Sequence, residues 1–289
     1  ADVAAYVHEG SSMDREARLR GNSVYFPDRV VPMLPERISN DLCSLRPDED
    51  RAALAIRLVI GADGRVKKHT LHRILMRSHA KLAYEHAQRI IDSDERTHEA
   101  YPWLKTLYQA WNATREERGA RNPLDLDLPE RKLKLNPQGA VERVYVPARL
   151  DAHRLIEDFM ILANVAAAEF LERAQVPLIY RVHDEPSAEK RETLRAVLAD
   201  LGTDLPKGER LTPMQFNRIL EKFRDTEHQI FINEIVLRSQ AQAEYSPQSI
   251  GHFGLNLRRY AHFTSPIRRY ADLIVHRALI RSAALGSDG

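Results

Sequence analysis

The strongest constraint on the fold is a long amphipathic segment between Asp151 and Pro177. Apolar side chains recur along it every three or four residues, as they do on the buried face of a helix. They are Leu155, Phe159, Leu162, Ala166 and Phe170. Asp151 can cap the first turn and Pro177 cannot continue the last one, so the pattern predicts one long helix. Further helical patterns follow it, and the C-terminal half is therefore predicted to be mainly helical.

Before this segment the chain carries signals for β-hairpins. Residues 53–60 and 65–74 read as strands joined at Ala62-Asp63-Gly64, and residues 132–135 and 141–146 flank Asn136-Pro137-Gln138-Gly139. Other strands are predicted over 2–7 and 178–182, and helices over 11–20, 81–91, 101–117, 188–201, 214–223 and 227–239. The mixture predicts an α+β fold, with a mixed sheet and hairpins packed by many helices. We expect one domain over residues 1–284 and a tail over 285–289.

The composition limits the kinds of partner and compartment. The net charge is only +2, so a nucleic-acid site would have to be a local patch or channel. Cys43 is the single cysteine, which excludes an internal disulfide and fits a reducing interior. No apolar run approaches the roughly 20 residues of a membrane span. We therefore expect a cytoplasmic protein with no membrane partner. Because the sequence starts at Ala1 without methionine, we interpret it as part of a longer chain.

The stretch from Tyr260 to Leu273 contains two arginines where a helix should begin. Ser265 is a favourable N-cap and Pro266 suits the first helical position, which predicts a helix over 267–279. Arg268 and Arg269 would then lie in the first turn, where the helix dipole disfavours cations unless an anion is bound. A phosphate would satisfy both features. The alternative is structural: Arg268 would pair with Asp272 at i,i+4 spacing while Arg269 is solvated.

The wider sequence around this stretch is basic and aromatic. Between residues 258 and 281 there is one acid, Asp272, against six arginines, at positions 258, 259, 268, 269, 277 and 281. Tyr260, Phe263 and Tyr270 lie among them. Basic side chains interleaved with rings are typical of surfaces that bind single-stranded nucleic acid.

Several motifs, in order, cover nearly the whole chain. They are GNSVYFPD at 21–28, PMLP at 32–35, LCSL at 42–45, SHAKLAY at 78–84, LIEDFMILAN at 155–164 and HFGL at 252–255, followed by the arginine stretch. In this order they resemble the catalytic domain of the ribonuclease II family, and most of all its bacterial RNase R type. The resemblance implies a processive 3′-to-5′ exoribonuclease that draws single-stranded RNA through a channel and releases nucleoside 5′-monophosphates.

The resemblance also implies roles for individual residues. Arg268 would hold the scissile phosphate, and Tyr84 would position the terminal nucleotides. Tyr25 would stack on a base, and Glu157 would contact the last nucleotide. Further RNA contacts are expected from three residues, namely Ser265, Arg269 and Asn164, the last because it lies seven residues beyond Glu157 on one helix face. Without the resemblance, both tyrosines would be ordinary core residues and Glu157 would pair with Arg154.

The family cleaves RNA at a magnesium site formed by clustered aspartates, since such a metal prefers hard oxygen ligands. On the family pattern these aspartates precede residue 1, so we expect no metal ligands in this chain. Flanking oligonucleotide-binding domains are expected in the parent protein. The chain alone would then bind RNA weakly and cut it slowly or not at all. The alternatives are a nuclease-dead RNA-binding or regulatory module and a helical scaffold without a role in RNA.

Overall fold

The structure is a computed structural model that describes residues 1–206 and 210–287. The chain divides into two compact units. The first comprises Ala1–Glu117, Lys132–Ile179 and the segment from Ala261 onward; the second comprises Arg118–Arg131 and Tyr180–Tyr260. All seven residues expected to contact RNA belong to the first unit. Positions 288 and 289 of the expected tail lie outside the described residues.

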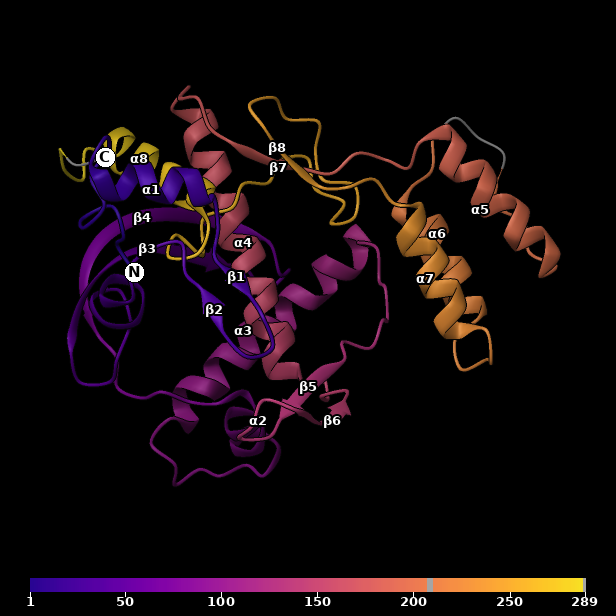
Figure 1. Ribbon diagram of the computed structural model, residues 1–289, viewed down its shortest axis with the longest axis horizontal. Helices are drawn as coiled ribbons and strands as arrows, with labels where there is room; N and C mark the ends of the chain where they lie inside the picture. The colour runs from indigo at the N-terminus through magenta and orange to yellow at the C-terminus, as the bar shows by residue number, and fades with distance from the viewer. Residues whose placement is uncertain (207–209, 288–289) are drawn as a thin grey trace. The chain divides into compact units, whose positions relative to one another are not determined.

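The first unit contains most of the regular elements (Figure 1). Its helices are α1 (Ser12–Arg20), the π-helix η1 (Arg37–Leu42), α2 (Tyr84–Asp92), α3 (Tyr101–Arg121, of which this unit includes the part up to Glu117), α4 (Asp151–Arg173) and α8 (Tyr270–Ser282). Its strands are β1 (Val24–Tyr25), β2 (Val30–Val31), β3 (Asp50–Ile60), β4 (Val66–Arg77), β5 (Lys132–Leu135) and β6 (Val141–Tyr145). The α+β class is confirmed. In the described residues the strands form separate two-stranded antiparallel pairs, whereas a larger mixed sheet was expected.

Helix α4 is the long helix predicted from the apolar stripe, and it packs against α2, α8 and β3. Its buried face includes Leu155, Ala166 and Leu171, which are at most 3% exposed. Two polar residues share that face and are paired there. The Asp158 carboxylate accepts a hydrogen bond from the indole N–H of the buried Trp111 at 2.8 Å, and Asn164 bonds the backbone of a distant segment. Burial of a polar group is tolerated when such a partner is present.

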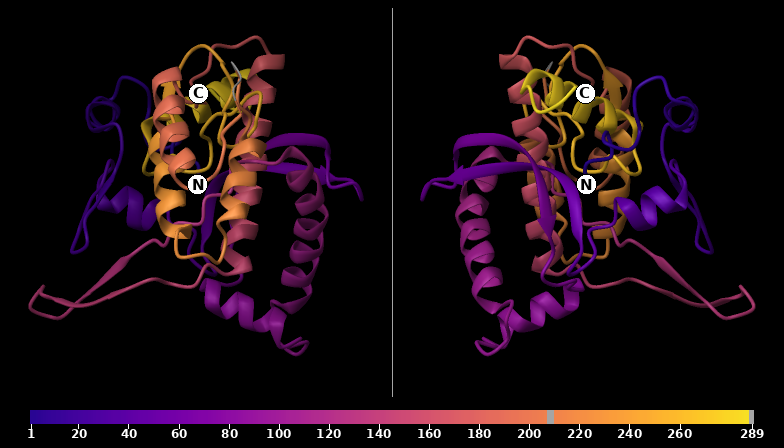
Figure 2. Two further views of the ribbon diagram at one scale, coloured as in Figure 1. Left: turned by 90° about the vertical axis from the view of Figure 1, so that its right-hand side faces the viewer. Right: turned by 90° about the vertical axis from the view of Figure 1, so that its left-hand side faces the viewer.

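The β3–β4 hairpin follows the predicted turn. Pairing runs from Asp50 opposite Arg77 to Ile60 opposite Val66. Gly64 in the turn has φ +72°, and a Cβ there would lie 2.1 Å from the carbonyl oxygen of Ala113 in α3. Only glycine meets both requirements, because it tolerates positive φ and allows close approach of another backbone. In Figure 2 the hairpin curves strongly along its length.

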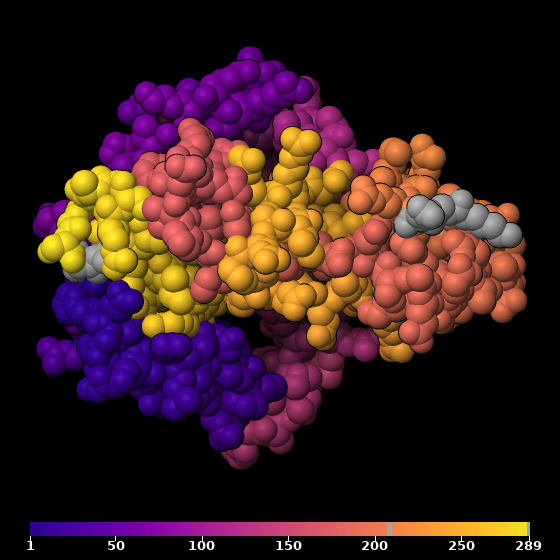
Figure 3. All heavy atoms as spheres, turned by 90° about the horizontal axis from the view of Figure 1, so that it is seen from above, coloured from indigo at the N-terminus to yellow at the C-terminus, as the bar shows by residue number. Residues whose placement is uncertain are grey.

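The start of the chain packs against α8, as Figure 3 shows for the indigo and yellow segments. The Asp14 carboxylate pairs with Arg277 at 2.8 Å and accepts the Tyr270 hydroxyl at 2.9 Å. Burial opposes ionisation of Asp14, but the hydrogen bonds from Gly10, Arg277 and Tyr270 outweigh it and lower the pKa of this carboxyl. The helix predicted over residues 11–20 is confirmed, with Ser11 as its N-cap and Gly21 as its C-cap.

The strand expected over residues 2–7 is wrong. Tyr6 and Val7 both donate backbone N–H groups to the Val3 carbonyl, which closes a turn. Val3 and Val7 are fully buried, so the apolar positions repeat every fourth residue. That repeat is typical of a helical turn, not of a strand.

The second unit contains β7 (Tyr180–Val182), β8 (Glu244–Ser246), α5 (Ala188–Asp200), α6 (Pro213–Lys222) and α7 (Gln229–Ser239). The three helices enclose a core that includes Leu198, Phe216, Ile232 and Val236, none of them exposed. Within the described part of the chain, no helix has the length and apolar character needed to cross a membrane.

Candidate nucleic-acid interface

The arginine stretch folds differently from the prediction. Helix α8 begins at Tyr270, with Arg269 as its N-cap, instead of beginning at Ile267 after Ser265. The N–H groups of Arg268 and Arg269 both donate to the Ser265 carbonyl, at 3.2 and 3.1 Å, and close one turn. Arg269 then becomes extended, with φ −137° and ψ 122°. We call residues 265–269 the arginine turn.

A tertiary β-bridge explains the late start of the helix. Ser23 donates its N–H to the Arg268 carbonyl at 3.0 Å, and Tyr270 donates to the Gly21 carbonyl at 2.8 Å. Asn22 and Arg269 are therefore paired as in an antiparallel sheet. If the helix began at Ile267, these backbone groups would point along the helix axis and both hydrogen bonds to residues 21–23 would be lost. The favourable sequence Ser265-Pro266 does not compensate for their loss.

Asp272 holds the arginine turn from inside the protein. Its carboxylate is fully buried and accepts two hydrogen bonds from the Arg269 guanidinium, at 2.7 and 2.8 Å. It also accepts the Ser265 N–H at 2.7 Å. The pairing of Asp272 with Arg268 is therefore wrong, because the partner is Arg269. The Arg269 side chain, expected to bind RNA, is occupied by this bidentate pair.

Arg268 is left as the cation of the turn. Its side chain is exposed, and across residues 1–206 and 210–287 it forms no ion pair or hydrogen bond. Its backbone, in contrast, is fixed on both sides by the bridge and by the Ser265 carbonyl. A fixed backbone with an unpaired guanidinium is suited to bind an anion, since arginine can hold a phosphate with two hydrogen bonds.

Tyr25 lies close to the arginine turn. It follows the bridged Ser23 by two residues, pairs with Val30 in the β1–β2 hairpin and is 60% exposed. A hollow of about 300 Å³ is lined by Tyr25 together with Ile267, the residue before Arg268. The interpretation of Tyr25 as a partly buried core residue is therefore wrong. An exposed ring that shares a hollow with the arginine turn can stack on a base while Arg268 contacts a phosphate.

Tyr84 and Glu157 form a second group at the start of α4. The Tyr84 ring is 42% exposed and stacks on the His153 ring, with centroids 4.1 Å apart and planes 26° apart. His153 and Glu157 lie one helical turn apart on α4 and so share a face. The Glu157 carboxylate pairs with Arg149 at 2.6 Å, and Arg154, its expected partner, pairs with Asp151. His153 was not identified from the sequence, although its i,i+4 spacing to Glu157 was visible.

Asn164 does not line a surface with Glu157. It is only 2% exposed, and its amide oxygen accepts the Phe263 N–H at 2.8 Å. On the other side of the same peptide segment, the buried His276 donates Nε2–H to the Phe263 carbonyl at 2.7 Å. Asn164 therefore anchors the segment that leads into the arginine turn, and its expected contact with RNA is corrected to this structural role.

Helix α4 connects the two groups of residues. Glu157 and Asn164 are seven residues apart on it, which corresponds to about 10 Å along the axis. Glu157 belongs to the group with Tyr84, whereas Asn164 holds the segment that carries Arg268. The structure thus attaches both groups to one rigid element.

His276 makes the anchoring of this segment sensitive to acid. Burial lowers the pKa of His276 from its usual value of 6.5 to about 4. The hydrogen bond to the Phe263 carbonyl raises this pKa, but the effect of burial is larger. The unfolded chain gains a proton near pH 6.5 but the folded chain does not, so acid favours unfolding between these pH values. We expect His276 to reduce the free energy of unfolding by about 2 kcal/mol between pH 7 and 5.

Urea unfolding of the wild type and of His276→Gln at the two pH values measures this effect. The variant lacks the titrating ring, so its stability should change less with pH than that of the wild type. Equal pH dependence in the two proteins would contradict the assignment.

Among the described residues, the acids outside this interface form no metal site. Across the described ranges, no group of three or more His, Cys, Asp or Glu side chains is arranged to hold a metal ion. Asp125 and Asp127 lie in an irregular segment of the second unit. Their N–H groups donate to the side chains of Asn217 and Asn233. The residues that the structure describes therefore do not fit a magnesium site.

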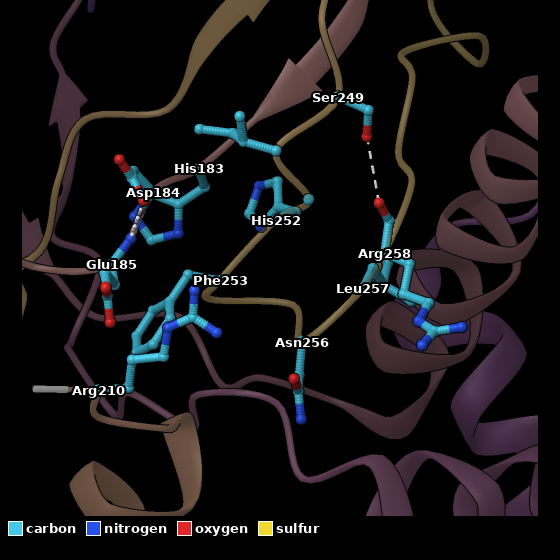
Figure 4. Close-up of a pocket in the computed structure, with 12 residues that line it drawn as sticks. His183, Asp184, Glu185, Arg210, Ser249, His252, Phe253, Asn256, Leu257 and Arg258 are labelled. Atoms are coloured by element: carbon cyan, nitrogen blue, oxygen red, sulfur yellow. Dashed lines mark hydrogen bonds between the residues drawn. The ribbon is translucent and has the colours of Figure 1, made fainter.

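The second unit contains a separate hollow of about 570 Å³, shown in Figure 4. His183 and His252 lie side by side in it, with ring centroids 5.0 Å apart. Both ring nitrogens of His183 are bonded to backbone: Nε2 donates to the Ala241 carbonyl, and Nδ1 accepts the Gly254 N–H. Burial lowers the pKa of His183. This histidine therefore braces the turn formed by the HFGL motif.

Comparison with known proteins gives consistent matches over the whole chain. A family model described as the RNB domain matches residues 1–283. Ribonuclease R of Escherichia coli is 43% identical over 286 residues, which cover 96% of this chain and 35% of that protein. The chain thus spans about a third of the length of this relative.

Solved structures agree with this comparison. Mycoplasma genitalium RNase R in complex with ribose-methylated single-stranded RNA has a TM-score of 0.92 and 30% identity, covering 100% of this chain and 46% of that one. Yeast Ssd1, described as a pseudonuclease, has a TM-score of 0.76 and 25% identity, covering 97% of this chain and 35% of that one.

Proposed function

The chain belongs to the RNB-domain family, and from this premise we propose that it forms the RNA-binding part of the active site of a hydrolytic exoribonuclease. The enzyme would act processively on single-stranded RNA from the 3′ end and release nucleoside 5′-monophosphates. The observation that carries the proposal is the exposed Arg268 side chain, which has no acidic partner in the described residues while its backbone is fixed.

Each exposed residue of the interface has a role in this proposal. Arg268 binds the scissile phosphate and stabilises charge that develops on it during cleavage. Tyr25 stacks on a base in the adjoining hollow. Tyr84, supported by His153, positions the terminal nucleotide, and Glu157 accepts hydrogen bonds from its sugar hydroxyls, which would favour RNA over DNA. Ser265 and Arg269 act through the shape of the arginine turn.

We propose that hydrolysis requires magnesium and that its carboxylate ligands come from residues outside this chain. Magnesium would supply Lewis-acid activation of water and phosphate. The described residues do not fit such a site, and no step through the metal is assigned to them. In this proposal the chain alone binds RNA weakly and cuts it slowly or not at all, and flanking oligonucleotide-binding domains strengthen binding in the full-length protein.

The test is degradation of single-stranded RNA by the full-length protein. With a 5′ label, the enzyme should produce stepwise shortening from the 3′ end, and released nucleotides should carry 5′-phosphates. Chelation of the divalent metal should stop cleavage while leaving RNA bound. Products with internal cuts or shortening from the 5′ end would contradict the proposal. The same assay on the chain alone tests whether it is inactive by itself.

The second candidate is an RNA-binding or regulatory module without nuclease activity. It is favoured by the similarity to yeast Ssd1, which shows that this fold also occurs in a pseudonuclease. Binding of single-stranded RNA without cleavage, in the presence of magnesium, would support this candidate over the first. The presence or absence of clustered aspartates in the parent protein before residue 1 also separates the two.

A further inference from the structure

The β5–β6 hairpin has one cationic face. Lys132 lies opposite Tyr145, and Lys134 lies opposite Arg143. Directly opposed residues of an antiparallel pair point to the same side, as do alternate residues of one strand. These four side chains therefore share a face, while Leu133 and Val144 lie on the other one. The hairpin extends away from the start of α4 in both views of Figure 2.

The cations of this face are exposed and incompletely paired. Lys134 contacts Glu142 at 3.0 Å, but Lys132 and Arg143 have no acidic partner in the described part of the chain. The Arg143 guanidinium lies over the Tyr145 ring, 4.9 Å from its centroid. Lys134 and Arg143 are like charges placed directly opposite each other, and Glu142 offsets the charge of Lys134, so the charge of Arg143 is left uncompensated by an acid of the described residues.

We propose that this cationic face binds the phosphates of single-stranded RNA upstream of the nucleotides held at Arg268 and Glu157. The inference rests on the proposed function and names a further contact of the same RNA strand. Charge complementarity supports it: Lys132 and Arg143, which have no acidic partner in the described residues, match a phosphate backbone, and the Tyr145 ring under Arg143 matches its bases.

The hairpin is also continuous with the interface. Tyr145 is four residues before Arg149, so these two residues are at most about 14 Å apart. Arg149 in turn pairs with Glu157. An RNA strand whose last nucleotide lies at Glu157 therefore needs only a few more nucleotides on its upstream side to reach the cationic face.

The test uses the full-length protein with Lys132→Gln and Arg143→Gln combined. Binding is measured without divalent metal, so that the RNA is not cleaved, with single-stranded RNAs of about 25 and about 5 nucleotides. The long RNA should bind about tenfold more weakly at physiological salt, and the slope of log affinity against log salt should decrease by about 1.4, or about 0.7 for each lost phosphate contact. The short RNA should bind as it does to the wild type.

A matched control removes two cations from the β3–β4 hairpin. Arg57 and Lys68 are exposed and lie on one face of β3–β4, so Arg57→Gln with Lys68→Gln makes the same change in net charge. This variant should bind both RNAs like the wild type. Equal weakening by both double variants would indicate a net-charge effect and overturn the proposal, as would unchanged binding and salt slope in the β5–β6 variant. If the wild type itself fails to bind or degrade RNA, the proposed function fails instead.

Discussion

Arg268→Ala is expected to slow RNA degradation by about 10²- to 10³-fold in the full-length protein, because in the proposed function it removes the cation that stabilises charge on the scissile phosphate. The folded structure should be unaffected, since the Arg268 side chain is exposed and forms no ion pair or hydrogen bond in the described residues. Single-turnover degradation of a short RNA measures the rate of the chemical step, and thermal unfolding measures stability.

A second arginine serves as the control. Arg281 is exposed on α8, away from the arginine turn, and pairs with the exposed Glu9. Arg281→Ala therefore makes the same change in net charge as Arg268→Ala without altering the turn. Its degradation rate should be close to that of the wild type. Arg268→Lys should recover only part of the activity, because lysine cannot form the planar two-bond contact with phosphate. Full activity of Arg268→Ala would exclude Arg268 from catalysis.

Asp272→Ala is expected to lower the free energy of unfolding by about 3 kcal/mol, the lower end of the range for breaking a buried ion pair. The lower end applies because the Arg269 side chain is 19% exposed and can reach water when its partner is removed. The variant also leaves the Ser265 N–H without its acceptor. Chemical denaturation measures the loss, and hydrogen exchange should show faster exchange at residues 263–270.

Two comparisons make this result specific. Glu9→Ala removes the exposed partner of Arg281 on α8 and should lower the free energy of unfolding by at most about 1 kcal/mol. Asp272→Asn keeps the shape and one acceptor oxygen, so it should destabilise less than alanine. An alanine variant as stable as the wild type, with unchanged exchange at the arginine turn, would show that Asp272 does not hold this segment.

Sequence patterns predicted the elements whose formation depends on interactions between residues close in the sequence. Helix α4 was predicted from its apolar spacing, α1 as a helix over residues 11–20, and the β3–β4 turn from Ala62-Asp63-Gly64, and all three are confirmed. In each, the determining interactions lie within a few residues: a side-chain cap, a glycine with positive φ, or neighbouring positions on one face.

The basic stretch at residues 258–281 shows where a prediction from local sequence fails. From the sequence, residues 258–281 contain six arginines and one acid. In the structure, Arg277 pairs with Asp14, and Arg281 pairs with Glu9. These acids lie more than 250 positions away in the sequence, so the local charge count overstated the cationic surface. The candidate site was recognised because its motifs resemble a family.

By itself, the sequence determined the α+β class, the long helix and the candidates Arg268, Tyr25, Tyr84 and Glu157. Only the tertiary structure decided which of two adjacent arginines has an exposed side chain and which is held by a buried acid. A bridge to residues 21–23 delays the start of α8, and the buried Asp272 then binds Arg269 and leaves Arg268 exposed. The physical reason is that backbone pairing with a distant segment outweighs the local preference of Ser265-Pro266 for a helix start, and no local pattern encodes that partner.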